Sequence, residues 1–121
     1  MVEDIIAILN NSSALISLLG GCHIYPYTTD YMGECVLYQV IPQSDNKAVN
    51  KIRIQLSVIA ETLDTALAVE KILKQLLLTF GDEPLTHSVL QVEQNGGGSL
   101  YDYGRCKYHH YIFLDITGRS E

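Results

Sequence analysis

The spacing of hydrophobic residues is most regular between residues 50 and 81, where its period changes from two to three or four. Apolar side chains first occupy every second position, with polar residues between them: Ile52, Ile54, Leu56 and Val58. Successive side chains of a strand point to opposite faces. The pattern therefore predicts a strand over 51–60 with one apolar face, which is typical of an antiparallel sheet covered on one side.

A helix is predicted over residues 62–80, directly after this strand. Its apolar residues recur at three- and four-residue intervals and form one stripe: Ala66, Val69, Leu73, Leu76, Leu77 and Phe80. Gly81 suits the position after a helix, and Pro84 prevents its continuation. Such a helix is about as long as the preceding strand, so it can lie along the sheet and cover its apolar face.

The N-terminal residues 2–19 are also helical in pattern. Asn10–Ser13 interrupts them with four weak helix formers, so the helix either kinks or ends near Asn10 and restarts with Ser12 or Ser13 as N-cap. We favour two short helical pieces, stopped by Gly20 and Gly21.

The remaining segments are predicted to be extended. Residues 22–26 form a brief extended segment, and strands are predicted over 34–41, 86–93 and 105–116. In the last strand, Tyr108, His110, Ile112, Leu114 and Ile116 share one face. The glycines of residues 95–99 predict a mobile hairpin loop rather than a phosphate-binding loop, because no helix follows them.

These elements predict one α+β domain over residues 1–121. We expect a roughly four-stranded, mainly antiparallel sheet with two helices packed on one face, in the order α-β-β-α-β-β. A chain of 121 residues can bury enough surface to fold without disulfides.

Charge and hydropathy narrow the classes of partner. Eight Lys and Arg against 14 Asp and Glu give a net charge of −6, which argues against sequence-specific binding of nucleic acid. No apolar run reaches the length of a membrane span, so we expect no membrane partner.

The candidate chemistry is sparse. Potential metal ligands are spread over the chain and do not show zinc spacing: Cys22, His23, Cys35, His87, Cys106, His109 and His110. His109 and His110 are adjacent on a strand, so they face opposite sides. No nucleophile motif is present. We therefore expect no catalytic residue, no metal and no cofactor, and we interpret the protein as a non-enzyme.

Two groups of residues are candidates for an interface. Leu67 and Leu78 lie about 100° from the main stripe of the central helix, beside Lys74. They fit a wide core stripe, contact with a second helix or a subunit interface. Tyrosines crowd the region after the glycines, and tyrosine is enriched at protein interfaces as well as in ordinary sheets.

The chain resembles the tail-completion, or tail-terminator, proteins that join head to tail in long-tailed bacteriophages and prophages. The similar segments are Leu18–Gly21, His23–Pro26, Val36–Ile41, Ile52–Val58, the acidic and Ala-rich Ala66–Glu70, and Leu100–Tyr103. The sequence departs from the family at Glu34 and Cys35, where similar proteins often carry a proline, and in its glycine-rich connection.

The resemblance implies a structural protein that forms a ring, commonly a hexamer, which caps the tail tube and joins it to the head connector. Its partners would be copies of itself, the tail tube and head-completion proteins. It would assemble in the host cytoplasm and reside at the head-proximal end of the virion tail. A ring needs two complementary patches, for which we expect the helix flank and the late loop: Leu63, Leu67 and Leu78, and Tyr101, Asp102 and Tyr103.

Two other interpretations remain open at this point. One is an α+β protein-interaction (adaptor) domain unrelated to phage, because a fold alone does not determine function. The other is a small hydrolase or metal enzyme that uses the region of His109 and His110.

Overall fold

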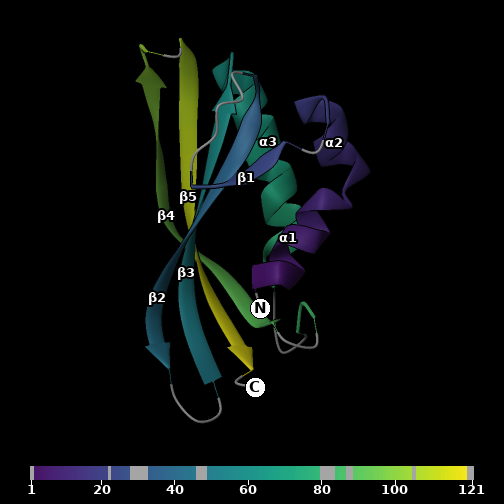
Figure 1. Cartoon of the computed structure of the whole chain (residues 1–121), viewed down its shortest axis with the longest axis vertical. Coiled ribbons are helices and arrows are strands. Elements are labelled where there is room, and N and C mark those ends of the chain that lie inside the picture. The colour runs from purple at the N-terminus through teal and green to yellow at the C-terminus, as the bar shows by residue number, and fades with distance from the viewer. Residues whose placement is uncertain are drawn as a thin grey trace.

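Three helices lie on one face of a five-stranded sheet in the computed structural model (Figure 1). The structure describes residues 2–21, 23–27, 33–45, 49–79, 84–86, 89–104 and 106–119. In chain order, the elements are α1 (Val2–Asn10), α2 (Ser13–Leu19), β1 (Ile24–Pro26), β2 (Cys35–Asp45), β3 (Val49–Ala60), α3 (Leu63–Leu77), β4 (Val89–Asp102) and β5 (Lys107–Arg119).

The N-terminal helical region is divided into two helices, as the sequence predicts. The side chain of Ser12 accepts a hydrogen bond from the backbone N–H of Leu15 at 3.2 Å and begins α2. Gly20 ends α2 in the left-handed region, with φ of 74°. The axes of α1 and α2 differ by 70°. With α3, the described chain has three helices, so the predicted number of two is wrong.

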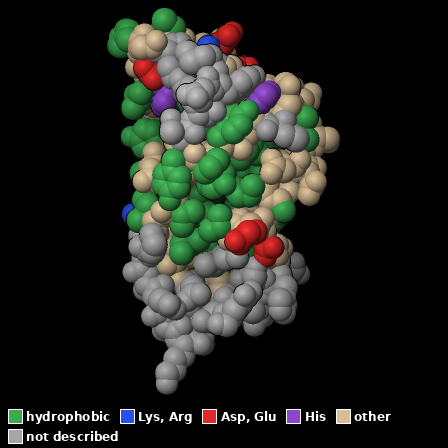
Figure 2. All heavy atoms as spheres, in the orientation of Figure 1, with side chains coloured by type: hydrophobic (Ala, Val, Ile, Leu, Met, Phe, Trp, Pro, Cys, Tyr) green, Lys and Arg blue, Asp and Glu red, His purple; other side chains and the backbone are tan. Residues whose placement is uncertain are grey.

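The sheet contains one more strand than the sequence predicts. Its order is β1-β2-β3-β5-β4, with β1 parallel to β2 and the other pairs antiparallel. The predicted brief extended segment becomes β1, because its residues pair with Val36, Leu37 and Tyr38. A three-residue strand carries too short a pattern to reveal its pairing partner. Hydrophobic side chains gather in the middle of the face that carries β1 and α1 (Figure 2).

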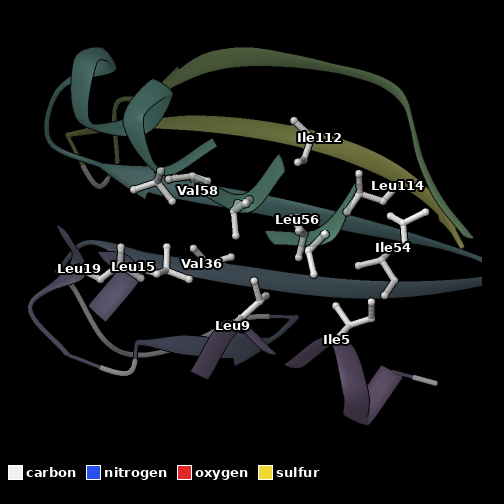
Figure 3. Packing of buried hydrophobic residues seen from close by; sticks show 14 of the residues in the cluster. Ile5, Leu9, Leu15, Leu19, Val36, Ile54, Leu56, Val58, Ile112 and Leu114 are labelled. Carbon is white, nitrogen blue, oxygen red and sulfur yellow. The ribbon is translucent and has the colours of Figure 1, made fainter. Parts of the chain in front are cut away.

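The core lies between the helices and the predicted apolar face of the sheet. Ile54, Leu56 and Val58 of β3 are buried beside Ile112 and Leu114 of β5, which confirms the alternation in both strands. Ile5 and Leu9 of α1 and Leu15 and Leu19 of α2 point into the same interior (Figure 3). Fully burying each such side chain stabilises the fold by about 1.5–3 kcal/mol.

The central helix α3 is shorter than the sequence predicts. Ala66, Val69, Leu73 and Leu77 are buried as expected, but Leu78 is already extended, with ψ of 135°. The next residue, Thr79, bonds to β4: its backbone N–H donates to the carbonyl of Val92 at 3.2 Å, and its Oγ accepts from the Val92 N–H at 3.0 Å. These bonds compete with helical ones and end α3 early. Gly81 lies outside the described residues.

The glycine-rich segment does not form the predicted mobile hairpin loop, because it lies inside β4. Gly97 and Gly98 pair with Ile112 and Tyr111, after a register shift between Gln94 and Gly97. A Cβ on Gly97 would lie 2.6 Å from the carbonyl oxygen of Tyr111, so the two strands approach too closely for a larger residue. The turn into β5 instead follows Asp102.

Within the described residues, no single helix has the length and hydropathy to cross a membrane. Only α1 and α2 counted together satisfy that test, and their axes are bent by 70°.

Candidate interaction surface along β4

The edge strand β4 is buried at its start, at Val89 and Val92, but is poorly covered by the helical layer from Gln94 onward. Helix α3 packs on β3 and β5, whereas β4 is the outermost strand on this side of the sheet (Figure 1). Gln94, Gly97, Ser99 and Tyr101 lie on the side of β4 that faces the helices, because they pair with Leu114, Ile112, His110 and Tyr108. All four are exposed. An exposed strand edge with an uncovered face is open to pairing with another chain.

Leu63 and Leu67 occupy the flank of α3 that borders this uncovered strip. They lie seven and three residues before Glu70, and this spacing places the three side chains on one helical stripe. Glu70 in turn reaches His110 on β5, which fixes the direction of the stripe toward β4 and β5. Leu67 is 44% exposed and Leu63 is 39% exposed. Their exposure fits the predicted interface role.

Leu78 is not part of this flank. It is the residue that ends α3, it is partly buried, and it packs against the hydrophobic core. Of the three helix residues predicted for an interface, the structure brings together only Leu63 and Leu67. The helical period places Leu78 near Leu67, because the hydrophobic pattern does not show that α3 ends before Leu78.

Three tyrosines stack at the end of β4. The Tyr101 ring meets that of Tyr103 at 4.9 Å between centroids and that of Tyr108 at 5.0 Å, both nearly perpendicular. Such edge-to-face pairs contribute about 0.5–1.5 kcal/mol each. Burial raises the pKa of Tyr101, and the nearby Cys106 adds to the effect. Tyr103 is 83% exposed and available for contact.

Asp102, also predicted as an interface residue, is engaged within its own turn. Its Oδ1 accepts a hydrogen bond from the N–H of Gly104 at 3.0 Å, and its Oδ2 lies 3.4 Å from Nε2 of His109. These contacts give Asp102 a role in shaping the turn that presents Tyr103. Helix flank and tyrosine cluster lie on the same side of the molecule. We call the residues Leu63, Leu67, Ser99, Tyr101 and Tyr103 the β4 surface.

A chain of hydrogen bonds underlies the β4 surface. Nδ1 of His110 lies 2.5 Å from Oγ of Ser99, and its Nε2 lies 2.6 Å from Oε2 of Glu70. The other carboxylate oxygen of Glu70 lies 2.8 Å from Nζ of Lys74. Among the described residues, His110 is the one buried polar side chain, at 8% exposure. The chain satisfies a polar group that would otherwise be costly to bury.

The charge of Glu70 depends on this chain. Burial by itself raises the pKa of Glu70, but the hydrogen bonds from Lys74 and His110 outweigh it and hold the pKa below its ordinary value of 4.5. The sequence analysis placed His110 on the apolar face of its strand but missed its partners. The one available signal was a histidine among core positions, since a buried histidine requires polar partners.

The opposite face of the sheet carries a second polar network. Nε of Arg53 donates to Oδ1 of Asp115 at 2.9 Å, and Nδ2 of Asn95 donates to Oδ2 at 2.8 Å. Burial raises the pKa of Asp115, but these two donors outweigh it, so the pKa lies below the ordinary value of 3.8. His109 is on this face and His110 on the other, as the sequence predicts. In the described part of the chain, no three His, Cys, Asp or Glu side chains converge as metal ligands.

Comparison with known proteins gives a likeness of fold. No protein-family model matches the chain, and no curated protein matches it in sequence. A chain in a solved structure, described as the virion of a native gene transfer agent (GTA) particle, superimposes with a TM-score of 0.72 and 15% sequence identity. The match covers 96% of this chain and 92% of that chain. The three-helix, five-stranded architecture is thus one that a virion chain of almost the same extent also adopts.

Proposed function

We propose that this protein is a structural component of a phage or prophage virion. The observation that carries the proposal is the fold shared with a chain of the gene transfer agent virion over nearly the full length of both chains. The residues that resemble tail-completion proteins give independent support. The finer role proposed is that of a ring that caps the tail tube and joins it to the head connector.

The β4 surface supplies the kind of contact that such an assembly needs. Exposed leucine and tyrosine side chains border an uncovered strand, and tyrosine is one of the residue types that carry most of the binding energy at protein interfaces. The proposed partners are other copies of the chain, with the tail tube below the ring and head-completion proteins above it. The proposed place of action is the host cytoplasm during assembly and then the head-proximal end of the tail.

The net charge of −6 suits a ring through which DNA passes, because like charge keeps the phosphate backbone from adhering to the wall. No turnover is required of such a protein. The proposed mechanism is burial of complementary surfaces, with no substrate and no cofactor.

Localisation in the particle tests the proposal. A small tag at the C-terminus, detected with a labelled antibody by electron microscopy, is expected at the junction of head and tail. Loss of the gene is expected to leave separate heads and tails, and its return should rejoin them. A tag found along the tail shaft or on the capsid surface would contradict the ring role, and a tag absent from particles would contradict any virion role.

The chain Ser99–His110–Glu70 favours one second candidate, a serine hydrolase. An exposed hydroxyl, an imidazole and a carboxylate follow one another at 2.5 and 2.6 Å, in the order of a nucleophile, a base and an orienting group. Labelling of Ser99 by a fluorophosphonate probe, abolished by Ser99→Ala, would support this activity. Absence of labelling in the folded protein at neutral pH would exclude it, and the structural proposal expects that absence.

A further inference from the structure

A groove lies at the other edge of the sheet from β4. It is formed between one side of α1 and Tyr38 of β2, has a volume of about 430 Å³, and is lined by Val2, Glu3, Ile6, Ala7, Asn10 and Tyr38. Three of these side chains are aliphatic and one is aromatic. Figure 2 shows the hydrophobic side chains of this face gathered near α1, with acidic side chains at their lower border. We call it the α1–β2 groove.

We infer that the α1–β2 groove receives the β4 surface of a second copy of this chain. The inference rests on the proposed ring, and it specifies which two surfaces of the subunit meet. The sheet order β1-β2-β3-β5-β4 places the two surfaces at opposite edges. A contact between different surfaces at opposite edges is head-to-tail, and head-to-tail contacts generate closed rings when the rotation between subunits closes.

The covering of the sheet supports this pairing. Helices α1 and α2 pack against α3, and Val89 and Val92 at the start of β4 are buried in the core, but the helix-facing side of β4 is exposed from Gln94 to Tyr101. The exposed side of α1 from one copy can lie over β4 of the next copy, beside Leu63 and Leu67 of its α3. The helical layer then continues from subunit to subunit, and the exposed leucines are buried against Val2, Ile6 and Tyr38.

Beyond the short strand β1, the sheet edge is also suited to this contact. β1 pairs only with residues 36–38 of β2, so β2 from Gln39 onward has no neighbour on that side among the described strands. The outer edge of β4 is the other end of the sheet. Both edges carry backbone donors and acceptors that a second copy can pair.

Glu3 at the groove and Lys71 on α3 give the two surfaces one pair of opposite charges. Glu3 lies at the groove, is exposed, and has a pKa held below 4.5, first by a hydrogen bond from its own backbone N–H, so it is ionised at neutral pH. On α3, Lys71 is exposed and lies one turn beyond Leu67 on the same flank, whereas Lys74 further along is paired with Glu70. Lys71 is therefore the cation beside the exposed leucines that Glu3 of a second copy would approach.

Two single variants, each of which damages one surface, test the inference. Ala7 is exposed in the groove, so Ala7→Trp should fill it without disturbing the core, and Ala14→Trp on α2 is the matched control outside the groove. Leu67→Glu damages the β4 surface. Each variant alone is expected to lose self-association by more than about tenfold, while Ala14→Trp behaves as wild type. Circular dichroism and thermal melts confirm that each variant is folded.

Mixing the two variants identifies the pairing. Ala7→Trp retains the β4 surface and Leu67→Glu retains the groove, so the mixture is expected to form one-to-one dimers that grow no further. Native mass spectrometry and sedimentation velocity, at concentrations where the wild type assembles alone or on tails that lack the protein, measure this. Wild-type rings together with unaffected assembly of Ala7→Trp would overturn the inference and leave the ring intact. Failure of the wild type to assemble on such tails would overturn the ring itself.

Charge exchange gives an independent readout. Glu3→Lys and Lys71→Glu are each expected to weaken association by about two- to fivefold, and the double variant should recover most of the loss. Additive losses in the double variant would show that these charges do not face each other and would contradict the proposed orientation.

Discussion

Nε2 of His110 on β5 lies 2.6 Å from Oε2 of Glu70 on α3, although 40 residues separate them in the chain. This bond joins the helix to the sheet at the border of the β4 surface. It therefore fixes how far α3 is shifted along the strands, and with it the place of Leu63 and Leu67 relative to Tyr101. A hydrogen bond to a charged group contributes about 1.5–3 kcal/mol.

Removing one partner of this bond should destabilise the fold more than removing both. We expect His110→Ala to lower the free energy of unfolding by about 1–3 kcal/mol, because it opens a cavity and removes a partner of the Glu70 carboxylate. The double variant Glu70→Leu with His110→Leu should be nearly neutral. Urea unfolding measures both, with Gln75→Ala at an exposed position of α3 as control. Equal losses in single and double variants would contradict the coupling.

Acid should weaken the protein through Glu70. Its pKa in the folded state is below 4.5, so its contribution to stability is complete above that value and is lost as the pH falls through the lowered folded pKa. Urea unfolding between pH 7 and pH 3 should show this loss, and Glu70→Gln should flatten the curve below about pH 4.5. An acid slope in Glu70→Gln as steep as in the wild type would contradict this assignment.

The glycines of β4 should tolerate alanine in a definite order. A Cβ on Gly97 meets the backbone of Tyr111 at 2.6 Å, whereas a Cβ on Gly98 meets the movable end of the Tyr111 side chain at 2.9 Å. Gly104 in the turn has only the Asp102 carboxylate at 3.3 Å. We expect Gly97→Ala to cost about 1–3 kcal/mol, Gly98→Ala less and Gly104→Ala least, as judged by thermal unfolding. A reversed order would show that the segment does not pair as β4.

Alanine variants of Tyr103 and Tyr101 should differ in their effects on self-association and on the free energy of unfolding. Tyr103→Ala is expected to lower the free energy of unfolding by no more than about 1 kcal/mol, because this side chain is 83% exposed and loses only its ring contact with Tyr101. It should weaken self-association about five- to thirtyfold if Tyr103 is a contact residue. Tyr101→Ala removes two ring contacts and should also lower stability. Unchanged assembly of Tyr103→Ala would remove the turn from the interface.

The predictable part of the fold is the part encoded by local periodicity. The alternation of β3 and β5, the stripe of α3 and the break at Ser12 all follow from residues that are neighbours in the chain. The errors occur where a distant partner decides the outcome. Thr79 leaves the helix because Val92 offers two hydrogen bonds, and Gly97 is extended because β5 lies against it.

The candidate site likewise has residues that the local sequence reveals and contacts that depend on distant segments. Leu67 could be chosen from the sequence because it lies off the main apolar stripe of its helix, and Tyr103 because tyrosines crowd the segment after the glycines. The link from Glu70 through His110 to Ser99 depends on the shift of α3 along the sheet, which no single segment specifies. The α1–β2 groove joins elements about 30 residues apart and has no motif of its own.

The register shift between Gln94 and Gly97 has a geometric consequence for assembly. A bulge increases the right-handed twist of its strand, and twist rotates one border of a sheet relative to the other. If neighbouring subunits join through the two edges of their sheets, that rotation sets the angle between one subunit and the next. The number of subunits per turn then depends partly on one extra residue of β4. Deleting Gly96 should therefore change the diameter of the assembly or open it into a helix.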